Sequence, residues 1–96
     1  MKPPKSFDDF TSQFHADLEL THPDFASLRE LYESFRVWHG DDAVTELAAY
    51  FKRMRDDDQV DLVALWFDSK ADVFFSEEED IRRLFEDFEA WAASFS

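Results

Sequence analysis

The densest group of chemically active side chains is an acidic run in the middle of the chain, Asp56, Asp57 and Asp58, followed by Asp61. Carboxylates at alternate positions of a twelve-residue loop are typical of a calcium-binding EF-hand. In a loop that starts at Asp56, however, position 6 is Asp61 instead of glycine, and position 12 is Phe67 instead of glutamate. The spacing therefore argues against a calcium site. We expect Asp58 to lie in a solvated turn and to cap the following helix.

The three histidines are the next source of chemistry, because His15, His22 and His39 each lie two residues before an aspartate. None has a second histidine four residues away, as a helical zinc site has, and the chain contains no cysteine. A single glycine leaves no glycine-rich loop to hold a phosphate. No nucleophile, base and orienting group can be named together. We therefore predict that the protein is not an enzyme and has no metal or other cofactor.

About five helices are predicted to carry these residues. Apolar residues recur at helical spacing over 7–18, 25–38, 44–54 and 81–95, and the short segment 60–67 is apolar on nearly every side. Such an all-round apolar segment is expected to be a core helix enclosed by the others.

Capping motifs mark the ends of these helices. The pairs with the form of a capping box are Ser6 with Asp9, Thr21 with Asp24, and Ser76 with Glu79. Gly40 is expected to end the second helix. Asp41 or Asp42 caps the third, which should end near Arg55.

No alternating strand pattern and no internal repeat is visible in the sequence. With one glycine and short connections, the expected fold is all-α: a compact single-domain bundle of about five helices over 1–96, with a flexible N-terminus at 1–5. Most of the aromatic residues should fill its core. Those near expected helix ends are candidates for exposed interface anchors, namely Trp38, Trp66, Phe74 and Phe75.

The charge of the chain excludes some classes of partner. With 23 acidic and 10 basic residues, the net charge of −13 repels nucleic acid and anionic membranes and favours a basic protein. No apolar stretch is long enough for a signal peptide or a membrane span. We expect a soluble, cytoplasmic protein that binds neither nucleic acid nor membrane directly; its oligomeric state stays open.

The acidic surplus is concentrated at the expected helix starts. Capping and the helix dipole favour one or two acids at each start, but not runs of three or four that repel one another. Solubility and attraction of a cationic partner both explain the surplus. The candidate partner-binding residues are Asp56, Asp57, Asp58, Asp61, Glu77, Glu78, Glu79 and Asp80.

The stretch Phe14-His15-Ala16-Asp17 resembles the Phe-His-x-Asp stretch near the N-terminus of helical immunity proteins from contact-dependent growth inhibition systems. The order of helices that follows is similar as well. The resemblance implies a small cytoplasmic antitoxin that binds the toxic domain of an effector, often a nuclease. Phe14 would then be a core residue, with His15 or Asp17 closing a local hydrogen bond.

Together these features predict an immunity protein that occludes a cognate toxin, a basic nuclease domain, with an acidic surface. The alternative is an acidic nucleic-acid mimic that inhibits a DNA-binding or CRISPR effector protein, which needs carboxylates spaced along an extended surface like phosphates. A third class, an acidic adaptor, would bind through an exposed aromatic groove.

Overall fold

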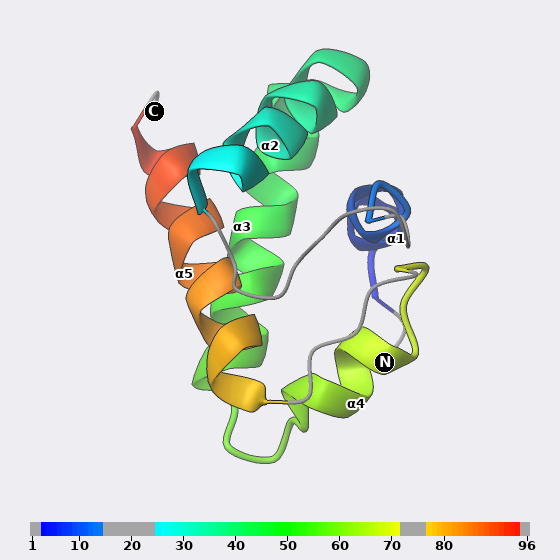
Figure 1. The fold of residues 1–96 in the computed structure, drawn as a ribbon, viewed down its shortest axis with the longest axis vertical. Coiled ribbons are helices and arrows are strands. Elements are labelled where there is room, and N and C mark those ends of the chain that lie inside the picture. Colours follow the sequence, from blue (N-terminus) through cyan, green and yellow to red (C-terminus); the bar gives the residue numbers. More distant parts are fainter. Residues whose placement is uncertain (1–2, 15–24, 72–76, 95–96) are drawn as a thin grey trace.

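The computed structural model describes residues 3–14, 25–71 and 77–94, which form five α-helices and no strand (Figure 1). In chain order the helices are α1 (Lys5–Thr11), α2 (Phe25–His39), α3 (Asp41–Asp56), α4 (Leu62–Phe67) and α5 (Glu78–Ala93). The predicted all-α bundle is therefore confirmed.

The centre of the bundle is the antiparallel pair α3 and α5, which lie side by side and make the most extensive contact between any two helices described (Figure 1). Helix α2 packs against both of them, α1 packs against α3 and α2, and α4 packs against α5. Because α3 and α5 run in opposite directions, the last turn of α3 lies beside the first turns of α5.

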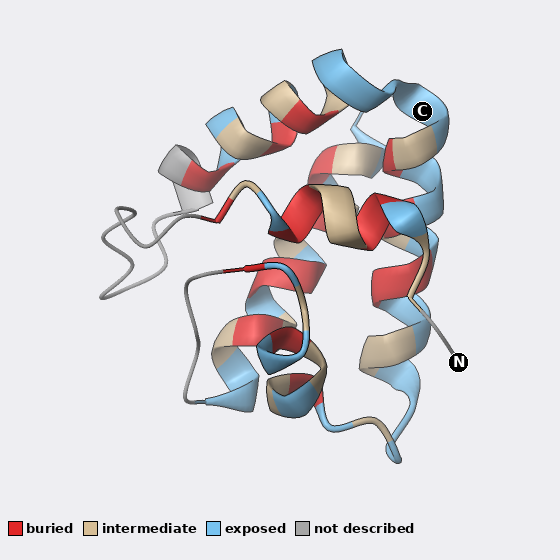
Figure 2. Ribbon diagram, turned by 90° about the vertical axis from the view of Figure 1, so that its right-hand side faces the viewer, coloured by how far each residue is buried: buried red, intermediate tan, exposed pale blue. Residues whose placement is uncertain are grey.

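One aromatic core joins these helices, and the buried positions face inward (Figure 2). The rings of Phe51 and Phe85 stack 4.0 Å apart between α3 and α5. Phe10 of α1 contacts the rings of Tyr32, Phe51 and Phe88, so this short helix touches α2, α3 and α5 through one side chain. An isolated two-turn helix is unstable in water, and burial of Phe10 stabilises it here.

The apolar spacing predicts most of the core. In α5 the buried residues are Ile81, Leu84, Phe85, Phe88 and Trp91, all on one face. Phe14, predicted to be a core residue, is fully buried with its ring edge-to-face against Trp66. In α2 the stripe holds through Phe35 but fails at its end, where Trp38 is 79% exposed.

The first helix differs from its prediction over 7–18. It begins at Lys5, within the segment expected to be flexible, and ends at Thr11. The Thr11 hydroxyl donates to the carbonyls of Phe7 and Asp8, and the N–H of Phe14 donates to the carbonyl of Thr11, so the chain leaves the helix in a tight turn. The predicted Ser6–Asp9 capping box is wrong, because Ser6 Oγ donates to Glu46 Oε1 of α3 over 2.7 Å.

The predicted cap at Asp58 is also wrong. The N-cap of α4 is Asp61, whose Oδ1 accepts from the backbone N–H of Ala64 over 3.2 Å. Upstream, Asp57 Oδ1 accepts from Gln59 N–H over 2.9 Å and forms a separate turn, which delays the helix start from the expected residue 60 to Leu62. Helix α4 is not enclosed on all sides either, since Phe67 is 64% exposed.

Gly40 ends α2 as predicted, with the positive φ of 90° that only glycine adopts easily. It is also the N-cap of α3, so neither Asp41 nor Asp42 caps that helix; both lie in its first turn instead. Helix α3 ends at Asp56, one residue after the prediction.

Several predicted features lie outside the described residues. They are the cap at Thr21 and Asp24, the cap residue Ser76, the aromatics Phe74 and Phe75, and the residues His15, Ala16 and Asp17 of the resemblance. Among the described helices, none has both the length and the apolar composition needed to cross a bilayer.

Candidate partner-binding surface

The two acidic runs of the sequence meet at one end of the bundle. Helix α3 ends at Asp56, and α5, which runs antiparallel to it, begins at Glu78 (Figure 1). The contact is direct, because Arg82 Nη1 donates to the backbone carbonyl of Arg55 over 2.9 Å. We call this surface the acidic end; it consists of Asp56, Asp57, Asp58, Asp61, Glu77, Glu78, Glu79 and Asp80.

Two carboxylates of the acidic end serve the local backbone. Asp57 holds the turn after α3, and Asp61 caps α4. A cap of this kind stabilises a helix by about 1 kcal/mol. These two residues therefore have a sufficient structural role.

Three further carboxylates form exposed ion pairs. Glu78 and Glu79 each bind the arginine four residues ahead, at 3.2 Å and 3.0 Å, and Asp56 lies 3.5 Å from Arg55. Exposed pairs of this kind contribute about 0.2–1 kcal/mol and weaken with salt. An incoming cation can replace such a partner at little cost.

The remaining three acids, Asp58, Glu77 and Asp80, make no side-chain hydrogen bond or ion pair with any described residue. Asp58 and Glu77 are exposed and Asp80 is half-buried. Their mutual repulsion is not offset within the described part of the chain. These residues therefore carry the surplus charge that local structure does not explain.

Arg55 is the basic centre beneath this surface. Its guanidinium binds Glu89 with two hydrogen bonds, Nε to Oε2 at 2.9 Å and Nη2 to Oε1 at 2.8 Å. Glu86 lies 3.9 Å away on the other side. The hydrogen bonds to Glu89 are the main cause of the raised pKa of Arg55, and burial opposes them. Sequence reasoning missed Glu86 and Glu89; their spacing of three puts both on one helix face, but only the packing of α5 on α3 shows that they meet Arg55.

Of the histidines considered for chemistry, only His39 is among the described residues. Its Nδ1 lies 3.6 Å from Asp9 of α1, not beside Asp41 as the sequence spacing suggested. Asp41 instead accepts from Arg36 Nε over 2.7 Å. No group of three or more His, Asp or Glu side chains in the described ranges is arranged to hold a metal ion.

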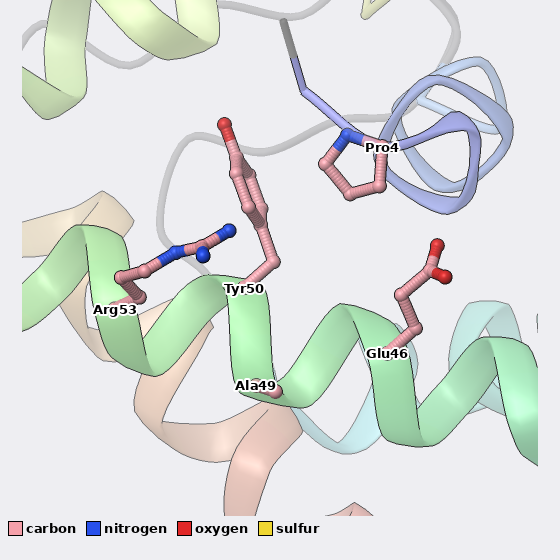
Figure 3. A pocket seen from close by; sticks show the side chains of 5 residues that line it. All are labelled: Pro4, Glu46, Ala49, Tyr50 and Arg53. Carbon is pink, nitrogen blue, oxygen red and sulfur yellow. The ribbon is translucent and has the colours of Figure 1, made fainter. Parts of the chain in front are cut away.

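A shallow hollow of about 540 Å³ lies between the start of α1 and α3. Pro4, Glu46, Ala49, Tyr50 and Arg53 line it (Figure 3). The Arg53 guanidinium lies 5.8 Å from the centroid of the Tyr50 ring, and burial raises the pKa of the Tyr50 hydroxyl. The ring is itself buried, and Glu46 is engaged by Ser6, so these groups do not form a set of nucleophile, base and oxyanion donor.

An apolar corner lies at the opposite end of α3, where Val37 and Trp38 in the last turn of α2 are 80% and 79% exposed. Trp38 was among the predicted interface anchors, whereas Trp66, another of them, is fully buried. Exposed tryptophans are enriched among residues that dominate binding energy.

Comparison of the chain with models of protein families gives no match. Searches against curated proteins and against solved structures give none either. The functional argument therefore depends on the surface itself.

Proposed function

We propose that this protein is an immunity protein, an antitoxin that binds and occludes the basic domain of a cognate toxin with its acidic end. The partner would be a nuclease domain delivered by contact-dependent growth inhibition, and the protein would act in the bacterial cytoplasm without catalysing a reaction. The observation that carries the proposal is the convergence of two acidic runs, about twenty residues apart in sequence, on one end of the bundle.

The division of roles among these acids supports binding over solubility alone. Solubility needs net charge anywhere on the surface, whereas eight carboxylates in one place repel one another. A basic cleft would relieve that repulsion and would be steered toward this end over roughly a Debye length, about 8 Å at physiological salt. The alternative of a nucleic-acid mimic needs an extended row of carboxylates, so the compact grouping favours the toxin.

Association kinetics test the proposal. We expect the double variant Asp58→Asn with Glu77→Gln to bind the product of the neighbouring toxin gene several-fold more slowly than the wild type, with a flatter dependence on salt. Neither residue has a structural partner among the described side chains, so the fold should persist.

The matched control is Glu30→Gln with Asp42→Asn, which removes the same two charges elsewhere on the surface. It should leave the association rate nearly unchanged. Equal slowing by both variants would assign the effect to net charge, and failure of the wild type to bind the toxin would refute the proposed function.

A further inference from the structure

A second surface adjoins the acidic end along the outer side of the α3–α5 pair. Here the two helices enclose a hollow of about 280 Å³ with mainly small residues around it. Its lining consists of Thr45, Ala48, Ala49, Lys52, Glu89, Ala92 and Ala93. Small side chains allow a foreign group to approach the helix backbones closely.

The hollow is continuous with the acidic end through a chain of printed contacts. Glu89 lines the hollow and binds Arg55, whose guanidinium lies 3.5 Å from Asp56 of the acidic end. Glu86 adjoins the same arginine. A partner that covers the acidic end therefore reaches the hollow without leaving this face.

We infer that the hollow receives an apolar side chain of the basic toxin domain, flanked there by lysine or arginine residues that face Glu86 and Asp56. This inference rests on the proposed function. Charge complementarity selects the occupant, because a second copy of this chain would bring the same carboxylates against each other. Electrostatic attraction sets the rate of encounter, whereas a buried apolar contact slows dissociation.

Filling the hollow tests this assignment. Ala93→Trp, and separately Ala49→Trp, should raise the dissociation rate of the toxin complex about tenfold or more while leaving the association rate nearly unchanged. Both positions are exposed, so the melting temperature should change little. Ala90→Trp is the control, since Ala90 is an exposed residue of α5 outside the hollow; its complex should dissociate at the wild-type rate.

A second measurement uses the unmodified protein. In ¹³C-methyl NMR spectra recorded with and without the toxin domain, the alanine methyls of the hollow should shift and those elsewhere should not. The two sets are Ala48, Ala49, Ala92 and Ala93 for the hollow, and Ala64 and Ala90 for the reference. This result would support the inference even if one tryptophan variant failed to fold.

The possible failures are distinguishable. A wild-type protein that does not bind the toxin overturns the proposed function and this inference together. A toxin that binds while both tryptophan variants dissociate normally, with unshifted methyls in the hollow, overturns the inference alone. Self-association detected by sedimentation and lost in Ala93→Trp would assign the hollow to a second copy and also overturn it.

Discussion

The ion pair of Arg55 with Glu89 should stabilise the protein far more than any exposed pair at the acidic end. The two side chains are only 23% and 17% exposed and are joined by two charge-assisted hydrogen bonds. A hydrogen bond to a charged group contributes about 1.5–3 kcal/mol when buried, and partial solvent screening lowers that value. We therefore expect a coupling energy of about 1.5 kcal/mol for the pair.

A double-mutant cycle measures this coupling by urea unfolding of Arg55→Ala, Glu89→Ala and the double variant. The cycle is needed because Arg55→Ala alone also leaves Glu86 and Asp56 without their arginine. For a domain of this size, each 1 kcal/mol corresponds to a change of about 4–8 °C in Tm, so Arg55→Ala should melt well below the wild type.

The pair of Arg83 with Glu79 is the control, because its side chains are 61% and 68% exposed at a similar distance of 3.0 Å. Its coupling should be about 0.3–0.5 kcal/mol and should vanish in 1 M salt, while that of Arg55 with Glu89 persists. Equal coupling energies for the two pairs would refute the argument that burial and two-point geometry make the difference.

Three further predictions concern stability. Asp61→Ala should cost about 1 kcal/mol in chemical unfolding through loss of the α4 cap, whereas Asp58→Ala should stay within about 0.5 kcal/mol; the reverse order would return the cap to Asp58. Phe10→Ala should cost about 3–5 kcal/mol, a large part of the total stability of a small domain, and a thermal melt close to that of the wild type would contradict its central place in the core. Burial, helped by the Asp87 carboxylate, raises the pKa of Tyr32 above its usual 10, so the folded state holds that proton more tightly. This contribution to stability is complete below about pH 10 and is lost as the pH rises above it; Tyr32→Phe should therefore flatten the fall in unfolding free energy between pH 9 and 11.

The sequence predicts the helices and most of the core because helical periodicity depends on local spacing alone. The stripes of α3 and α5 could be drawn directly, and so could the end of α2 at Gly40. The caps were harder to predict, because Ser6, Asp58 and Asp61 all have the right chemistry for an N-cap. Only the tertiary bond from Ser6 to Glu46 and the turn at Asp57 decide which of them is used.

The candidate site was predictable in composition but not in shape. The eight acids could be chosen from charge surplus alone. Their convergence depends on the antiparallel packing of α3 on α5, which no local pattern encodes. Trp38 shows the same limit, since its spacing continues the buried stripe of α2 while its position beyond the bundle leaves it exposed.

The central claim is that the protein occludes a toxin by staying bound to it, and a titration of toxin activity tests this most directly. Increasing amounts of the protein are added to a fixed amount of the neighbouring gene's toxin, and residual toxin activity is measured. The account predicts that protection saturates at an equimolar ratio and is unchanged in His15→Ala, His22→Ala and His39→Ala variants that remain folded. Full protection at a small fraction of the toxin concentration, or its loss in one folded histidine variant, would show catalysis and contradict the account.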